Sequence, residues 1–205
     1  MKKIIFIITA LLAVGCVPLT TSDIQSAKLV NKGEYELTPS ISLSINTIYF
    51  GLQGAYGLAE NANLRMRIER IKIKTDFEDE LNYFNFKESL THFSFGVKYN
   101  IFKDELAFYM PISFTYNNLD SFTLIEPTML FTKSGKHSEL NSSLKILITE
   151  QGETIDVINI GLGTSRNINK WVLRPELGCL GFISSDFKAC LPQVSLGLSI
   201  NVSSN

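Results

Sequence analysis

The chain has 205 residues, a length that suits one domain. Charged residues make up 19% of the sequence and the formal net charge is −1, so the chain lacks the basic balance expected of a nucleic-acid-binding protein. No apolar stretch after Cys16 is long enough to form a transmembrane helix.

The N-terminal residues have the pattern of an export signal. Lys2 and Lys3 give a positive start, and residues 4–12 form an apolar run broken only by Thr9. The sequence Ala-Val-Gly-Cys that ends at Cys16 resembles a bacterial lipobox. This resemblance implies that residues 1–15 are a lipoprotein signal peptide and that the mature chain begins at an acylated Cys16.

A polar segment of mixed composition follows the cysteine and includes Thr20-Thr21-Ser22-Asp23. Such a composition is typical of a flexible linker. We therefore expect residues 16–32 to form a lipidated tether, and residues 33–205 to form the folded domain.

From residue 33 onward, apolar and polar residues alternate with the period of two that is typical of β-strands. The first segment carries Tyr35, Leu37, Pro39, Ile41, Leu43 and Ile45 on one face, and Glu36, Thr38, Ser40, Ser42 and Ser44 on the other. The pattern recurs up to residue 202, and a change of phase between Ile68 and Ile71 suggests a β-bulge near Arg70. The sequence predicts an all-β fold, a single antiparallel up-and-down β-barrel of about ten strands (8–10).

The connections between these strands alternate between short and long. Short ones are expected at residues 59–62, 103–104, 134–137 and 167–170, and the longest at 75–90. With an even number of hairpin-connected strands, both termini lie at the same end of the barrel. The order of the connections makes this the end with the short turns. Because outer-membrane barrels have short periplasmic turns, this side suits a tether to the inner leaflet of the outer membrane. Loops at 75–90, 150–155 and 182–188 would then face outward.

Alternation alone does not say which face of the barrel is outside. The polar face is small and uncharged where a solvated surface would carry Lys and Glu, as in Ser40, Ser42 and Ser44. Aromatic residues also gather at strand ends, such as Tyr35 and Trp171, as in the two girdles of membrane barrels. A membrane barrel is therefore favoured. The alternative is a lipid-anchored, lipocalin-like soluble barrel that binds a small apolar ligand inside.

Two strand–turn–strand segments carry a family resemblance. Residues 56–64 (Tyr-Gly-Leu-Ala-Glu-Asn-Ala-Asn-Leu) and 167–171 (Asn-Ile-Asn-Lys-Trp) resemble the turns of small bacterial outer-membrane β-barrel proteins. The resemblance extends as a pattern over residues 33–202. It implies a lipid-anchored outer-membrane protein with a structural or surface-interaction role. Its partners are then membrane lipid, at the acyl anchor and around the barrel, and an extracellular partner of unknown identity.

Eight charged residues fall on the polar face and are expected in the lumen: Arg65, Arg67, Glu69, Lys98, Glu126, Lys145, Arg174 and Glu176. Buried charges are costly unless they are paired, and both signs occur among them. We interpret them as an internal salt-bridge network that fills a narrow barrel. A narrow path for ions is the less favoured alternative, because ten strands are far fewer than porins use for an aqueous channel.

Little in the sequence points to catalysis or to a bound group. His92 and Ser94 share a face, and resemble the His-x-Ser of outer-membrane lipid A deacylases. No acid is placed to orient His92, so we read it as a polar lumen residue and predict no catalytic residue and no enzyme. The acidic residues of 76–80 are interpreted as a solvated charge run rather than a loose Ca²⁺ site. We expect no metal site and no cofactor.

The two remaining cysteines, Cys179 and Cys190, would lie in an oxidising compartment if the export signal is used. A disulfide between them and two small buried thiols are equally compatible with the sequence, because spacing alone does not give the geometry.

Overall fold

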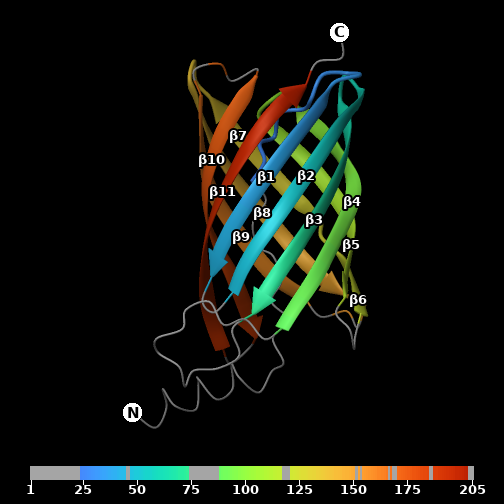
Figure 1. Cartoon of the computed structure of the whole chain (residues 1–205), viewed down its shortest axis with the longest axis vertical. Helices are drawn as coiled ribbons and strands as arrows, with labels where there is room; N and C mark the ends of the chain where they lie inside the picture. The colour runs from blue at the N-terminus through green and yellow to red at the C-terminus, as the bar shows by residue number, and fades with distance from the viewer. Residues whose placement is uncertain are drawn as a thin grey trace.

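The computed structural model describes residues 24–44, 47–73, 88–116, 121–150, 152, 154–165, 167, 170–184 and 187–202, with the backbone alone for 88, 155, 180–184 and 187–191. Within these ranges no helix is long and apolar enough to cross a membrane. The described β-strands form one antiparallel sheet that closes into a barrel (Figure 1). They are β1 (Tyr35–Ser44), β2 (Thr47–Ala59), β3 (Ala62–Ile73), β4 (Glu88–Phe102), β5 (Leu106–Tyr116), β6 (Ser121–Ile125), β7 (Thr128–Ser134), β8 (Ser138–Thr149), β9 (Thr154–Thr164), β10 (Trp171–Ser184) and β11 (Phe187–Val202).

The eleven strands occupy ten positions around the barrel. Strands β6 and β7 both lie between β5 and β8, and they are separated only by Glu126 and Pro127. A proline lacks the N–H that a strand ladder needs, so the break falls at this point. The barrel closes where β1 pairs with β11. The prediction of an all-β, up-and-down barrel of about ten strands is confirmed.

The two ends of the barrel differ in their longest connection, as the sequence predicts, but the predicted outward loop at 182–188 is wrong, because β10 continues to Ser184 and β11 begins at Phe187. The β1–β2 connection at the same end is equally short, so short and long connections do not alternate strictly. At one end Tyr35 of β1 pairs with Val202 of β11, and four short connections join β2 to β3, β4 to β5, β7 to β8 and β9 to β10. We call this end, at the top of Figure 1, the short-turn rim. The opposite end is the long-loop rim, and its longest connection, residues 74–87, lies outside the described residues.

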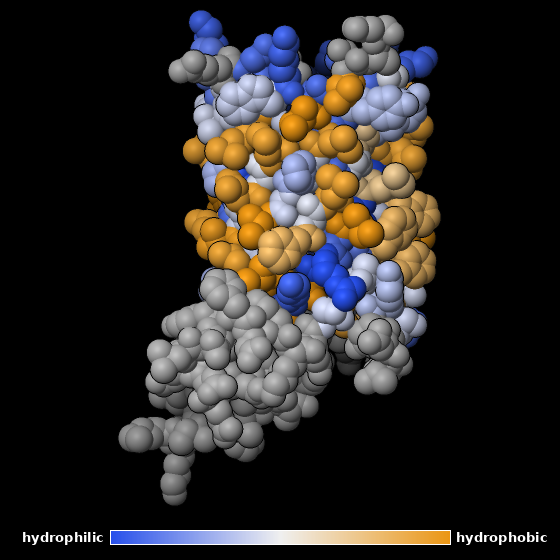
Figure 2. Space-filling model, viewed as in Figure 1, coloured by the Kyte–Doolittle hydropathy of each residue, from blue (hydrophilic) through white to orange (hydrophobic). Residues whose placement is uncertain are grey.

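Apolar side chains face outward and polar side chains face the lumen. Leu196, Ile158 and Leu177 expose 43%, 54% and 64% of their surface, whereas their neighbours along each strand are buried or half-buried. On the face of the molecule shown in Figure 2, orange apolar side chains gather in a band across the barrel wall. The soluble, lipocalin-like alternative is therefore wrong for this fold, because it requires the apolar face to line the interior.

The β-bulge predicted near Arg70 is also wrong. Strands β2 and β3 pair without interruption from Thr47–Ile73 to Gly57–Asn63. The change of phase instead turns Ile71 into the lumen, where it packs with Tyr49 and Leu90 near the long-loop rim. An apolar residue on the polar face of a strand thus mimics a shift of register.

Residues 24–33, which we call the strap, enter the barrel: residues 24–30 are buried or half-buried, and Asn31 and Lys32 are exposed at the rim. Ile24, Gln25, Ser26 and Ala27 are each at most 4% exposed. The part of the expected tether from 24 to 30 is thus packed, while residues 16–23 lie outside the described residues. Eight strands already give an interior that side chains just fill. Ten strands with small inner residues leave space that the strap occupies.

Candidate functional site

The lumen is the candidate functional site, because it gathers nearly all the buried charge of the described residues. The structure buries every one of the eight predicted lumen residues to 6% exposure or less: Arg65, Arg67, Glu69, Lys98, Glu126, Lys145, Arg174 and Glu176. Two further carboxylates, Glu36 and Glu139, are buried beside them and were absent from the predicted set. Both occupy inward positions of the period-two pattern, so the alternation contained the signal that places them.

The wall holds the strap mainly through its backbone. The Lys98 ammonium donates hydrogen bonds to the carbonyl oxygens of Ser26 (3.0 Å) and Lys28 (2.5 Å). The backbone N–H of Ala27 donates to Oγ1 of Thr132 at 2.7 Å. These contacts satisfy buried peptide groups that would otherwise be costly to desolvate.

The two ends of the strap are held in the same way. The backbone N–H of Ile24 donates to Oε2 of Glu176 at 2.9 Å. Near the rim, the Asn63 amide, oriented by its partners, accepts from the Val30 N–H (2.7 Å) and donates to the Val30 carbonyl (3.1 Å). Because both amide atoms engage one residue, Asn63 pairs with the strap as a neighbouring strand would.

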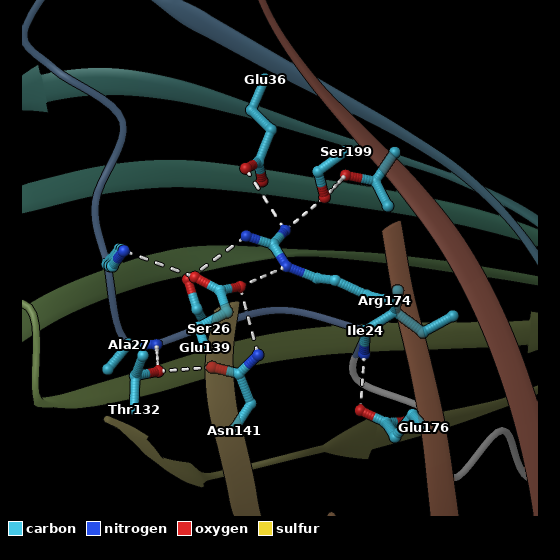
Figure 3. A network of polar contacts seen from close by, with 12 residues as sticks. Ile24, Ser26, Ala27, Glu36, Thr132, Glu139, Asn141, Arg174, Glu176 and Ser199 are labelled. Carbon is cyan, nitrogen blue, oxygen red and sulfur yellow. Dashed lines mark hydrogen bonds and ion pairs between the residues drawn. The ribbon is translucent and has the colours of Figure 1, made fainter. Parts of the chain in front are cut away.

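A first group of charges, the strap cluster, surrounds this segment: Glu36, Arg65, Lys98, Glu139 and Arg174. Figure 3 shows the Arg174 guanidinium between two carboxylates, with Nε 2.8 Å from Oε1 of Glu139 and Nη1 3.5 Å from Oε2 of Glu36. Arg65 also lies 3.1 Å from Oε1 of Glu36. Strap residues join the cluster, because Nζ of Lys28 is 3.5 Å from Oε2 of Glu139 and Oγ of Ser26 is 3.5 Å from Arg174.

A second group, the Glu126 cluster, lies deeper and contains Arg67, Glu69, His92, Glu126 and Lys145. Glu126 lies at its centre, 3.0 Å from Nη2 of Arg67 and 3.5 Å from Nζ of Lys145, and it accepts a short hydrogen bond from Ser113. Its position between β6 and β7, where the ladder is interrupted, directs this carboxylate into the lumen. The charges are paired, as buried charges must be to remain ionised.

His92 and Ser94 are both buried in this region, but their contacts do not form a catalytic pair. Nε2 of His92 lies 2.9 Å from Nη2 of Arg67, which can only donate, and Nδ1 lies 2.8 Å from Oγ1 of Thr115. Oε1 of Glu126 lies 3.4 Å from Nε2 of His92, so the expectation that no acid lies beside His92 is wrong. Oγ of Ser94 makes no hydrogen bond with any described residue. A nucleophilic serine requires a base within hydrogen-bond reach, so the hydrolase hypothesis lacks its central contact.

The remaining predicted positions are only partly visible. Cys16 and the acidic residues of 76–80 lie outside the described residues. Cys179 is disulfide-bonded, whereas the side chain of Cys190 is not described, so this pairing stays a prediction. The described part of the chain holds no group of three or more His, Cys, Asp or Glu side chains arranged to bind a metal ion.

Comparison with known proteins finds only distant structural similarities. No protein-family model matches the sequence, and no curated protein matches it. The N-terminal β-barrel domain of Pseudomonas aeruginosa OprF aligns with a TM-score of 0.37 and 10% identity, over 83% of this chain and 98% of that domain. The attachment invasion locus protein Ail of Yersinia pestis aligns with a TM-score of 0.35 and 12% identity, over 83% and 99%. A de novo designed transmembrane β-barrel gives 0.38 and 10%, over 84% and 98%.

Proposed function

We propose that this protein is a lipid-anchored outer-membrane β-barrel with a closed lumen and a structural or surface-interaction role. The observation that carries the proposal is the outward apolar wall. Each of the ten strand positions around the barrel carries large apolar side chains with about half of their surface exposed. A water-soluble monomer rarely exposes apolar patches beyond a few hundred Å², whereas a membrane barrel needs such a band to contact lipid.

The filled lumen supports a structural or interactive role over bulk transport. The strap and the strap cluster occupy the half of the barrel next to the short-turn rim. The Glu126 cluster crosses the deeper part, and Tyr49, Ile71 and Leu90 pack together below it. A porin-like aqueous channel needs many more strands and an unoccupied interior.

The lipid anchor is the finer part of the proposal, and it rests on Cys16 and the lipobox pattern before it. Ile24, which is buried, lies eight positions after Cys16, and a fully extended stretch of eight residue steps spans at most about 29 Å. An acyl group on Cys16 would thus stay close to the barrel. Incorporation of labelled palmitate into the wild type but not into Cys16→Ser tests this modification.

The membrane assignment is tested by separating the barrel from its anchor. A protease site is introduced between residues 17 and 22, isolated membranes are cut, and the membranes are washed with alkaline carbonate. A membrane-embedded barrel stays in the pellet after the cut. If the cut barrel appears in the supernatant while the uncut protein stays behind, the outward apolar wall does not contact the bilayer and the proposal is wrong.

A further inference from the structure

We propose that Arg70 and Lys72, on the outward face of β3 next to the long-loop rim, bind a phosphate group of lipid A in the outer leaflet. This inference rests on the proposed membrane-embedded barrel, and it names a lipid that one part of the wall recognises. It follows from three features of this part of the wall: two neighbouring cations that face outward, a depth marked by aromatic side chains, and the lack of a carboxylate beside the cations among the described residues.

The two cations occupy alternate positions of β3 and therefore share one face of the wall. Glu69 and Ile71 point into the lumen and are at most 1% exposed, whereas Arg70 and Lys72 are exposed. Residues two apart along a strand are separated by about 7 Å, so two long side chains can reach the same phosphate group. On the face shown in Figure 2, blue hydrophilic side chains interrupt the lower edge of the orange band.

The surroundings of this pair mark the depth at which a bilayer changes from acyl chains to headgroups. The outward face of β3 is apolar as far as Ile68 and becomes cationic at Arg70. Arg70 pairs across the sheet with Phe50, and Tyr116 ends β5 at the same rim; both aromatic side chains are about half exposed. Aromatic residues at strand ends lie at the membrane interface, so the two cations lie at the level of lipid phosphates.

The guanidinium of Arg70 is held in place by the neighbouring strand. Its Nη1 donates to Oγ1 of Thr91 at 2.7 Å, and its Nη2 donates to Oγ of Ser89 at 2.6 Å. These bonds use two of the five N–H donors of the group, and the others remain for a ligand. Nζ of Lys72 lies 6.0 Å from the ring centroid of Phe50. This cation–π contact uses none of the ammonium N–H donors.

The described residues provide no counter-charge for this pair. Their ion pairs join lumen residues to one another and to the strap. No carboxylate whose side chain the structure describes lies within ion-pair distance of Arg70 or Lys72. Cations on the lipid-facing side of a barrel are costly unless they lie near the interface, where a lipid phosphate can pair with them.

The number of cations indicates which lipid phosphate fits. A phosphate monoester carries a charge of about −1.5 to −2 near pH 7, which two adjacent cations balance. A phosphodiester carries a single negative charge. Lipid A presents phosphate monoesters on the side of the membrane where the long-loop rim is expected, whereas glycerophospholipids such as phosphatidylglycerol are phosphodiesters. Arginine also binds phosphate with two parallel hydrogen bonds, so lipid A suits this pair better than phosphatidylglycerol.

Retention of lipid A by the purified full-length protein tests the site. Native mass spectrometry in detergent measures how much lipid A stays bound as its concentration is varied. Arg70→Gln combined with Lys72→Gln should weaken binding at least roughly tenfold. Lys133→Gln combined with Lys170→Gln removes the same charge from exposed positions at the short-turn rim and should leave binding unchanged. A shift in gel mobility on heating confirms that each variant is a folded barrel.

A change of lipid tests the same site without any substitution. Lipid A without its phosphates keeps its acyl chains and should bind the wild type at least roughly tenfold more weakly. Phosphatidylglycerol should also bind more weakly than lipid A. Excess inorganic phosphate at constant ionic strength should not displace lipid A, because the free ion lacks the acyl chains that contact the apolar wall below the cations.

The outcomes separate this inference from the proposed function. Equal binding of lipid A, its dephosphorylated form and phosphatidylglycerol would overturn the site and leave the membrane barrel intact. Unchanged binding in the β3 double variant would also overturn it. A protein that does not insert into lipid vesicles contradicts the proposed function itself. Weaker binding on loss of either the β3 cations or the lipid phosphates, with no change in the short-turn variant, supports the site.

Discussion

The carbonyl oxygen of Asn31 lies in the space into which a side chain at position 57 would project. Around this contact the Gly33 N–H donates to the carbonyl of Gly57 (2.9 Å), and the Gly57 N–H donates to the carbonyl of Glu34 (3.1 Å). The strap therefore leaves the lumen by pairing with β2 at the short-turn rim. Gly57 is thus needed less for backbone freedom than for the close approach of two chains.

A larger residue at this position should displace the strap. Gly57→Val is expected to destabilise the folded protein by about 1–3 kcal/mol, the usual cost of overpacking a fitted site, and to speed tryptic cleavage after Lys28 and Lys32. Guanidinium unfolding and mass spectrometry of the digest measure the two effects. Gly54→Val, on the outward face of the same strand, should change neither. Equal digestion of both variants would show that Gly57 has no special relation to the strap.

The sequence predicts the barrel well and the strap not at all. Period-two alternation depends only on which side of a strand faces lipid, so it places Arg65, Lys98 and Glu126 on the inner side, where the structure buries them. The strap has no such period, because it buries consecutive residues of mixed character, from Ile24 to Ala27, and is held largely through backbone groups that every residue carries. The one available signal was indirect: small inner residues such as Gly57 and Gly197 leave a volume that no wall side chain fills.

The ammonium of Lys98 should control how often the strap opens. Lys98→Met keeps most of the side-chain volume but removes two charge-assisted hydrogen bonds, each of the order of 1.5–3 kcal/mol. The loss of even one of these hydrogen bonds should make the strap amides exchange at least roughly tenfold faster. Hydrogen exchange at Ala27 and Val30, followed by mass spectrometry, measures this. Lys133→Met, an exposed lysine on the neighbouring wall, is the control and should leave strap exchange unchanged.

The carboxylate of Glu126 should be the most sensitive single group of the deeper cluster. Glu126→Gln leaves Arg67 and Lys145 without the carboxylate that each contacts within 3.5 Å. Breaking a buried ion pair in this way typically costs about 3–5 kcal/mol. The unfolding midpoint in guanidinium should fall accordingly, and the further change Lys145→Met should recover part of the loss. A midpoint unchanged in Glu126→Gln would mean that the cluster is hydrated and not buried.

A lysine on the outward wall should be tolerated according to its depth. Leu196 lies in the middle of β11 and Val202 at its end on the short-turn rim, and both are exposed. In a bilayer, Leu196→Lys should cost about 2–4 kcal/mol and Val202→Lys about 0–1 kcal/mol. Reversible unfolding from lipid vesicles gives both values. Equal costs at the two positions would contradict a membrane with its midplane near the centre of the barrel.

The depth of the short-turn rim can be measured without any substitution, because Trp171 is the only tryptophan of the chain. It is the first residue of β10, is 39% exposed, and pairs with Ile200 beside the end of β11. Tryptophan at the end of a membrane strand lies at the level of the lipid headgroups. We expect lipids brominated near the headgroup to quench its fluorescence more than lipids brominated near the chain terminus. The reverse order would place this rim within the hydrocarbon layer, and the absence of quenching by either lipid would place it in water.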